Sequence, residues 1–265
     1  MQDRNMTVIG VLKRVAFYII LIIIWEMVYK LNVDIFKIWK PYTFPSPIAV
    51  AKTLITLISN NTLGIAIVVS LRRLVIGYFI SLVIGVAIGL LIVRYKYIDE
   101  NFSSLILGMQ TLPSLCWLPF AILWCGLNEK AILFVITIGS TFAIAIATES
   151  GIKNVNPLYM KAARTMGAKG WKLYLNVVIP AAMPAVITGM KQGWSFAWRA
   201  LMSGEMLSAT QGLGQVLMVG RNIADISQVM AVMIVILILG LLFDKFIFEK
   251  LEKNVRYKCG LDRRS

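Results

Sequence analysis

The 265-residue sequence contains no histidine, only three cysteines and few charged side chains. Without histidine, the chain lacks the most common general base and metal ligand, and it cannot form a histidine-dependent catalytic triad. Cys116 and Cys125 lie within apolar runs and Cys259 lies in a basic tail. This distribution argues against a disulfide framework or a metal cluster. We therefore expect no catalytic residue and no metal-binding residue, so a membrane-embedded enzyme is disfavoured.

The sequence also lacks a phosphate-binding loop of the form Gly-x-x-x-x-Gly-Lys-Ser/Thr. Such a loop supplies the backbone N–H groups and the lysine that hold a nucleotide's phosphates. We therefore expect this chain to bind no cofactor, so that any ATP and Mg²⁺ would bind to a partner subunit.

Charged residues make up 15% of the chain and hydrophobic residues 58%. An ordinary soluble domain has a charged share of about a quarter, so this composition indicates an integral membrane protein. The net charge of +14 could suggest nucleic acid as a partner. The basic residues are instead spread over short loops and tails, without one patch of interleaved aromatic side chains, so no nucleic acid is expected.

Six apolar runs are long enough to cross a bilayer. The first resembles the charged and apolar regions of a signal peptide, but no small-residue cleavage site follows it, so we interpret it as an uncleaved span. The predicted fold is an all-α integral membrane protein, with a single transmembrane domain of six helices over residues 1–265. The expected spans are about Val11–Tyr29, Leu74–Val93, Ser103–Cys125, Ala131–Thr148, Asn176–Arg199 and Val229–Ile247.

The segments between the spans carry further predictions. Residues 30–69 are predicted to form an external loop with a short amphipathic helix at 49–59, and residues 203–227 a second polar loop that contains Gly212 to Gly214. Arg72 and Arg73 are expected to snorkel at the outer edge of the membrane, with contact to an external partner as the alternative.

Glycine and proline give two further expectations inside the spans. Gly77, Gly85 and Gly89 lie on nearly one helix face, where small residues allow another helix to approach closely. Pro113 and Pro119 interrupt the third span, which predicts a kinked helix that either lines a pathway or simply packs.

The basic residues predict the orientation. Of the 27 lysines and arginines, 17 lie in the N-terminal segment, the loop after the second span, the loop after the fourth span and the C-terminal tail. Because positive residues concentrate on the cytoplasmic side, both termini and the loop after the fourth span are expected in the cytoplasm.

The loop after the fourth span has the pattern of a short amphipathic helix at about 156–167. Asn156 can cap it, Pro157 suits the first helical position, and Gly167 can end it. Its remaining residues divide between faces: Leu158, Ala162 and Met166 share one face with Tyr159 and Ala163 beside them, while Lys161, Arg164 and Thr165 point elsewhere.

The same stretch carries a long motif. Lys161-Ala162-Ala163 is followed after three residues by Gly167, and after nine more by Val177-Val178-Ile179-Pro180. This resembles the EAA motif, Glu-Ala-Ala-x3-Gly-x9-Ile-x-Leu-Pro, of permeases in binding-protein-dependent ABC importers. Four other segments resemble the nitrate, sulfonate, taurine and bicarbonate branch of that family, namely FPSPIAV, LPSLCWLPFAILWCGLNEKAILFV, NPLYMKAARTMGA and SGEM followed by GLG.

The resemblance implies a type I ABC importer permease in a bacterial plasma membrane. It implies a homodimer with a second copy of the chain, two cytoplasmic ATP-binding subunits and an external solute-binding protein. The short helix would be the coupling helix that docks on the ATPase, and the implied coupling residues are Asn156, Pro157, Leu158, Tyr159, Lys161, Ala162, Ala163, Arg164, Met166, Gly167, Ala168 and Pro180. Lys161 departs from the motif's glutamate and removes any salt bridge that this glutamate would make.

The fifth span contains candidate residues for a substrate pathway, namely Lys191, Trp194 and Arg199, with Glu205 just beyond it. A cation within a membrane faces the bundle interior by default and could attract an anion. The alternatives are that Lys191 pairs with Glu149 or Glu205, that Arg199 meets lipid headgroups, and that Trp194 and Trp198 serve the interface or helix packing.

The branch resemblance and these cations favour a small anion, such as nitrate or a sulfonate, as the imported solute. Related permeases serve thiamine precursors, riboflavin and other organic solutes, which remain alternatives. An ion-coupled secondary carrier is the second class considered. It would need paired repeats or a relay of ionisable residues at the membrane midplane, and neither pattern is found in the sequence.

Overall fold

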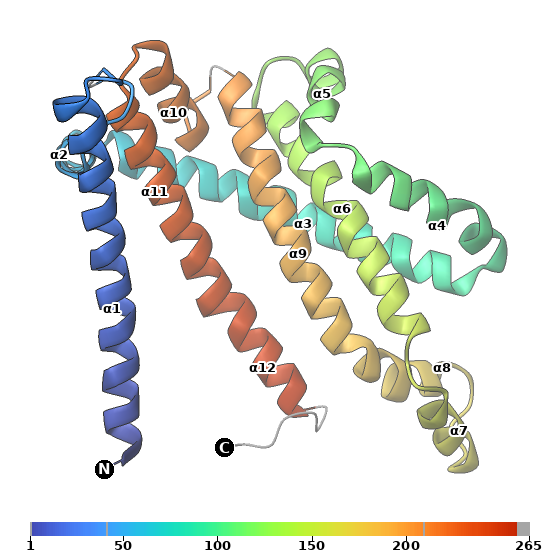
Figure 1. The fold of residues 1–265 in the computed structure, drawn as a ribbon. Coiled ribbons are helices and arrows are strands. Elements are labelled where there is room, and N and C mark those ends of the chain that lie inside the picture. The colour runs from blue at the N-terminus through green and yellow to red at the C-terminus, as the bar shows by residue number, and fades with distance from the viewer. Residues whose placement is uncertain (1, 41, 209, 259–265) are drawn as a thin grey trace. The chain divides into compact units, whose positions relative to one another are not determined.

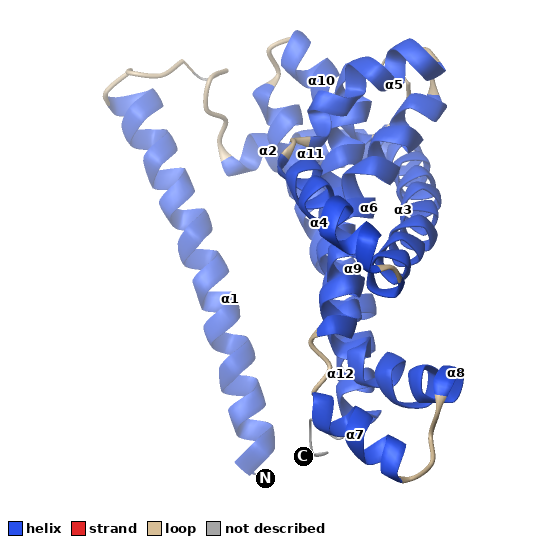
Figure 2. Ribbon diagram, turned by 90° about the vertical axis from the view of Figure 1, so that its right-hand side faces the viewer, coloured by secondary structure: helices blue, strands red, loops and turns tan. Residues whose placement is uncertain are grey.

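A computed structural model describes residues 2–40, 42–208 and 210–258, so Cys259 lies outside the described residues. The described residues form helices and connecting segments (Figure 2). The chain divides into two compact units. The first contains Met1–Ile65 and Val216–Val235, and the second contains Ala66–Gln215 and Ile236–Ser265.

Among the described residues, five helical segments can cross a membrane by their length and composition: Val15–Ile35, Thr62–Arg94, Glu129–Lys153, Gly170–Leu207 and Ile226–Tyr257. A further pair, Lys96–Thr111 and Ser114–Cys125, is bent by 101° and makes a sixth if it counts as one broken span. The six-span prediction is confirmed on that count, and the break falls at Pro113, as the proline pattern predicts.

In the first unit, helix α1 (Gln2–Tyr29) continues into a π-helical segment (Lys30–Ile35), and α2 (Pro47–Ser59) follows. The Ser46 side chain caps α2 by accepting a hydrogen bond from the Ala49 N–H at 3.2 Å. The Trp25 Nε1–H donates to the Pro45 carbonyl at 3.1 Å, and this bond ties the connecting segment back to α1. The predicted short helix at 49–59 is confirmed.

The loop prediction for residues 203–227 is wrong over much of its length. Helix α10 (Leu213–Asn222) lies there, and Leu213, Val216 and Gly220 are buried at helical spacing. Ala224 ends α10 with a positive φ of 58°, and α11 (Ile226–Phe243) begins two residues later.

In the second unit, most of the described core residues come from three helices: α3 (Thr62–Arg94), α6 (Glu129–Lys153) and α9 (Ile179–Leu207). Figure 1 shows α6 and α9 side by side, with α3 crossing behind them. A Cβ atom added at Gly77 would lie 2.7 Å from Ile136, and one at Gly89 would lie 2.6 Å from Thr148. The predicted close approach along the glycine face of α3 is confirmed, and its partner is α6.

The contact between α6 and α9 is equally close. A Cβ atom at Gly189 would overlap the methyl group of Ala147, and one at Gly193 would lie 2.6 Å from Ile144. Trp194 is 8% exposed in the same core, with its ring centroid 5.0 Å from that of Tyr78 and 5.1 Å from that of Phe243.

Several boundaries differ from the sequence prediction. Helix α3 begins at Thr62, so the last eight residues of the expected 30–69 loop are helical. The fifth span already starts at α8 (Gly170–Leu173), passes through a π-helical turn (Tyr174–Val178) and continues as α9. The first part of the basic tail is also helical, as a π-helical turn (Asp244–Phe248) and α12 (Glu249–Lys258).

Candidate functional site

Helix α7 (Pro157–Thr165) occupies the predicted position of the amphipathic helix. Asn156 caps it, because its Oδ1 accepts the Leu158 N–H at 2.9 Å. At the other end Gly167 has a φ of +87°, and the N–H groups of Gly167 and Ala168 donate to the carbonyls of Arg164 and Ala163. This pair of bonds is a Schellman motif, whose left-handed residue is usually glycine.

One face of α7 packs against the rest of the second unit. Ala163 is 9% exposed, and the partly buried Met160 packs against Val155, Val178 and Ala182. Ala163 therefore lies on the inner face, whereas its neighbour Ala162 is exposed.

The adjacent face of α7 is open and apolar. Leu158 is 65% exposed, Tyr159 55% and Met166 87%. Lys161 and Arg164 are also exposed, so basic side chains lie beside the apolar ones. Figure 2 shows α7 and α8 at the end of α9 where that helix begins. We call Leu158, Tyr159, Ala162 and Met166 the α7 patch.

An ion cluster holds the helices that lead into α7. Lys153, in the last turn of α6, pairs with Asp99 of α4 (Lys96–Thr111) and with Glu149, whose Oε1 lies 2.9 Å from the lysine nitrogen. The Ser103 hydroxyl donates to the same Glu149 carboxylate at 3.1 Å. Glu149 thus interacts with its own helix and with α4.

Lys191 has a different partner from the two that the sequence suggested. Its Nζ lies 2.8 Å from the Asp244 carboxylate, so the expected alternatives of Glu149 and Glu205 are both wrong. Asp244 belongs to the π-helical turn after α11, more than fifty residues away, and no local pattern connects the two. Trp194, the aromatic pathway candidate, is instead packed in the core, as the helix-packing alternative proposed.

Arg199 lies at a cavity of about 530 Å³ in the second unit. The cavity lies where the broken span bends. It is lined by the end of α4, by the segment that leads into the 3-10 turn Ser114–Trp117, and by residues of α6 and α9. Pro113 also lines it, consistent with the expectation of a kinked helix beside a pathway. Lys191 and Glu205 are not among the residues that line this cavity.

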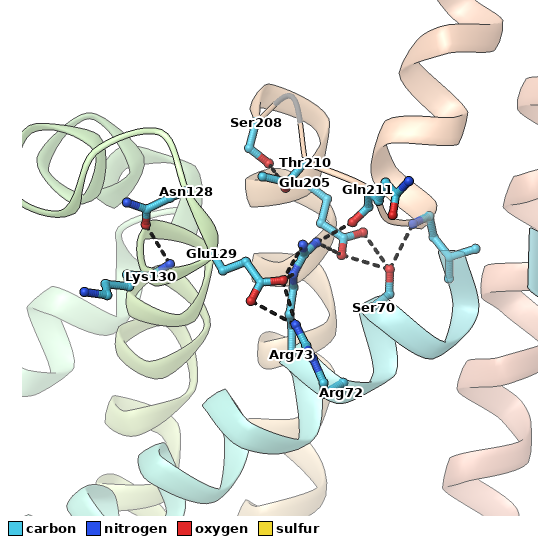
Figure 3. A network of polar contacts seen from close by, with 11 residues as sticks. Ser70, Arg72, Arg73, Asn128, Glu129, Lys130, Glu205, Ser208, Thr210 and Gln211 are labelled. Carbon is cyan, nitrogen blue, oxygen red and sulfur yellow. Dashed lines mark hydrogen bonds and ion pairs between the residues drawn. The ribbon is translucent and has the colours of Figure 1, made fainter. Parts of the chain in front are cut away.

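Glu205 is completely buried and is held from several sides (Figure 3). The Ser70 hydroxyl donates to both of its oxygens, at 2.8 and 2.7 Å, and the Gly214 N–H donates at 3.0 Å. Arg73 Nη1 lies 3.0 Å from Oε1, which completes an ion pair between α3 and α9.

Arg73 extends this network to a third helix. Its Nη1 also donates to the Gln211 carbonyl at 2.6 Å, and its Nη2 lies 2.9 Å from Glu129 of α6. The side chain is 4% exposed, so the expectation that Arg73 snorkels is wrong. Arg72 is 57% exposed and pairs with Glu129 at 2.7 Å, at the rim of the same network.

Sequence reasoning missed this network because its members are far apart in the chain. One local feature could have indicated it, namely the recurrence of glycine seven and nine residues after Glu205. A Cβ atom at Gly212 would overlap the Glu205 carboxylate, and one at Gly214 would lie 2.6 Å from the Glu205 Cβ. Those glycines allow the loop to close over the acid.

Comparison with known proteins agrees with these features. Residues 81–257 match the family model described as "Binding-protein-dependent transport system inner membrane component". The chain belongs to this family and is a multi-pass ABC transporter permease.

Three relatives illustrate the similarity. A Methanocaldococcus jannaschii protein named as an ABC transporter permease is 32% identical over 229 residues, which cover 84% of each chain. The nitrate import permease NrtB of Synechocystis sp. is 32% identical over 212 residues and 77% of each chain. A Bacillus subtilis protein named as an aliphatic sulfonate transport permease, SsuC, is 26% identical over 238 residues, which cover 90% of this chain and 84% of the relative.

Among solved structures, a chain of the inward-facing MetNI methionine ABC transporter matches with a TM-score of 0.62. The match covers 73% of this chain and 96% of the MetNI chain, at 20% identity. The likeness shows that the fold is that of a type I ABC importer permease.

Proposed function

We propose that this chain is the membrane subunit of an ATP-driven importer and that α7 is its coupling helix. The permease would act as a single functional domain and as a homodimer, with two ATP-binding subunits on the cytoplasmic side and a solute-binding protein outside. The charge distribution supports a cytoplasmic position for α7 and both termini. ATP and Mg²⁺ would be bound by the partner subunits.

The observation that carries this proposal is the α7 patch. Leu158, Tyr159 and Met166 are large apolar side chains on a short helix between two spanning helices, and more than half of each side chain is exposed. Exposed apolar side chains that cluster in this way commonly mark a protein interface, where a helix lies in a groove of its partner. The adjacent Ala162 is small enough to let the partner's backbone approach closely.

An importer also needs the docked helix to affect the pathway. Helix α7 packs through Met160 on Val178, at the end of the π-helical turn, and on Ala182, in the first turn of α9. A shift of α7 would therefore act directly on α9, which also carries Arg199. Two arrangements of this contact could alternate with ATP binding and hydrolysis.

The imported solute is proposed to be a small anion. Two relatives carry nitrate and aliphatic sulfonate names, and the cavity is lined by Arg199, which pairs with no carboxylate among the described residues. Other small organic solutes remain the alternative within the same importer class.

Co-purification and uptake test the proposal. We expect a Leu158→Glu/Met166→Glu variant to lose co-purification with the cognate ATP-binding subunit and to lower ATP-dependent uptake at least about tenfold. Both side chains are exposed, so the variant should still insert and fold.

Tyr97→Glu is the matched control. Tyr97 is 77% exposed at the start of α4, on the side that is predicted to be cytoplasmic, but it lies outside α7. This variant should keep its ATPase partner and its uptake. Normal uptake by the α7 variant, or uptake that needs only an ion gradient, would contradict the importer assignment and favour a secondary carrier.

A further inference from the structure

The cavity beside Arg199 combines one charged position with an aromatic wall. Its polar side chains come from α4, the following 3-10 turn and α9: Gln110, Thr111, Ser114, Arg199 and Ser203. Its apolar wall includes Trp117, Phe142, Phe196, Trp198 and Met202. The two kinds of lining suggest a ligand that is itself charged at one end and apolar at the other.

Arg199 differs from Lys191 and Arg73, two other cations within the spanning helices of this unit. Lys191 is paired with Asp244, and Arg73 is paired with both Glu205 and Glu129. Arg199 Nε donates only to the Ser195 carbonyl one turn earlier, at 3.2 Å, and the guanidinium stacks over the Phe196 ring at 4.7 Å. It has no ion pair with a carboxylate of the described residues, so its terminal N–H groups are available to an anion.

Of the other polar side chains in the cavity, two have no free proton to donate. The Thr111 and Ser203 hydroxyl groups already donate to the carbonyls of Gly108 and Arg199. Gln110 and Ser114 make no side-chain hydrogen bond to the described part of the chain, so an amide and a hydroxyl can add to the arginine. A guanidinium with an amide and a hydroxyl matches the several acceptor oxygens of a sulfonate or carboxylate head.

The volume of the cavity favours an organic anion over an inorganic oxoanion. An inorganic oxoanion occupies a volume only a few times the roughly 30 Å³ of a water molecule. A cavity of about 530 Å³ would leave such an ion surrounded by water, with the aromatic wall unused. An organic anion with an apolar body would occupy more of the space and place that body against Trp117, Phe142 and Trp198.

We propose that this cavity is a transient binding site for the imported solute, and that the solute is an organic anion whose sulfonate or carboxylate head meets Arg199 while its apolar body contacts the aromatic wall. The site rests on the proposed importer function and specifies its substrate class. It also gives the bend at Pro113 a role, because non-helical backbone at membrane depth is tolerated where it lines a solvated cavity.

Direct binding to the assembled transporter, without ATP, tests the site. The probes are ethane-, butane- and hexanesulfonate and nitrate, titrated against the complex in phosphatidylcholine nanodiscs by calorimetry. We expect affinity to rise about fourfold for each added methylene group. Nitrate should bind at least about tenfold more weakly than butanesulfonate.

Two variants separate the head from the body. Arg199→Gln should weaken binding of every sulfonate at least about tenfold, whereas Phe142→Ala should reduce the gain per methylene and leave ethanesulfonate nearly unchanged. Lys130→Gln removes a positive charge from the exposed first turn of α6, outside the cavity, and should change nothing. Intact ATPase co-purification of each variant confirms its assembly.

Specific outcomes would overturn the site. Equal binding of nitrate and butanesulfonate would remove the organic-anion assignment. Unchanged affinity in Arg199→Gln would remove the arginine from the site, and competition by phosphatidylglycerol in the nanodiscs would assign it to a lipid headgroup. None of these results bears on ATPase docking at α7, so the importer proposal would stand or fall separately.

Discussion

Arg73 and Arg199 show how differently two arginines can be accommodated in one membrane protein. Arg73 is almost fully buried and has two carboxylate partners on different helices. Arg199 is exposed at a cavity and has aromatic and backbone neighbours. A buried cation without a partner is strongly destabilising, so the first arginine requires its acids, whereas the second can remain open to a ligand.

Removing the acid from the buried pair should therefore destabilise the protein. Glu205→Gln leaves Arg73 with Glu129 only, and we expect a loss of about 3 kcal/mol and a clearly lower melting temperature in detergent. Arg72→Gln is the control, because Arg72 is 57% exposed and exposed ion pairs contribute about 0–1 kcal/mol. Equal melting temperatures for the two variants would show that the buried pair is not needed for stability.

At the residue scale, sequence reasoning identified the cations but not their partners. Lys191 and Arg199 stand out because charge is rare within spanning segments. Their surroundings depend on residues such as Asp244 and Ser114, which come from other helices, and Glu205 lies 132 residues from Arg73. Only packing brings such groups together, so a single sequence contains no local pattern that pairs them.

At the scale of elements, the glycine positions determine how closely the helices approach. Gly189 has no room for a Cβ atom, because Ala147 occupies the place where it would lie. Gly240, on α11, has open space around the same position. The two glycines therefore separate the effect of helix contact from that of helix propensity.

We expect Gly189→Ala to lower the melting temperature in detergent, since overpacking a close contact costs about 1–3 kcal/mol. Gly240→Ala should keep or slightly raise the melting temperature, because alanine favours helix more than glycine does. A Gly189→Ala protein as stable as the wild type would show that α6 and α9 can separate at little cost.

The sequence predicted the presence of most helices better than it predicted where they begin and end. The cap, proline and glycine around α7 each act on neighbouring backbone, so the helix could be placed from sequence with small errors. The start of α3 was missed because Arg72 and Arg73 are typical of a membrane edge. Arg73 can lie inside the protein because it pairs with Glu205, which is far away in the sequence. Helix α10 was missed because its length and polar flanks are typical of a loop.

At the scale of the whole molecule, the orientation follows from charge and makes a clear prediction. In a variant without the native cysteines, a cysteine at Asn128 should react with a membrane-impermeant thiol reagent in intact cells. A cysteine at Met166, which is 87% exposed, should react only after permeabilisation. Samples lacking the ATPase are the control for shielding of Met166, and labelling of Met166 from outside would reverse the orientation.

The π-helical turn at Tyr174–Val178 has a consequence for the direction in which α7 faces. In this turn the Ile179 N–H donates to the Tyr174 carbonyl, five residues back, so the turn holds one residue more than an α-helical turn would. An α-helix advances about 100° per residue, so deleting a residue from the regular part of α9 would swing α7 and α8 by about 100° around the axis of α9. Deleting the extra residue of the π-helical turn would instead restore a regular α-helical turn and leave α7 facing in nearly the same direction. The π-helical turn thus absorbs one extra residue between α8 and α9, and the direction of the α7 patch is the one that an uninterrupted α-helix would give.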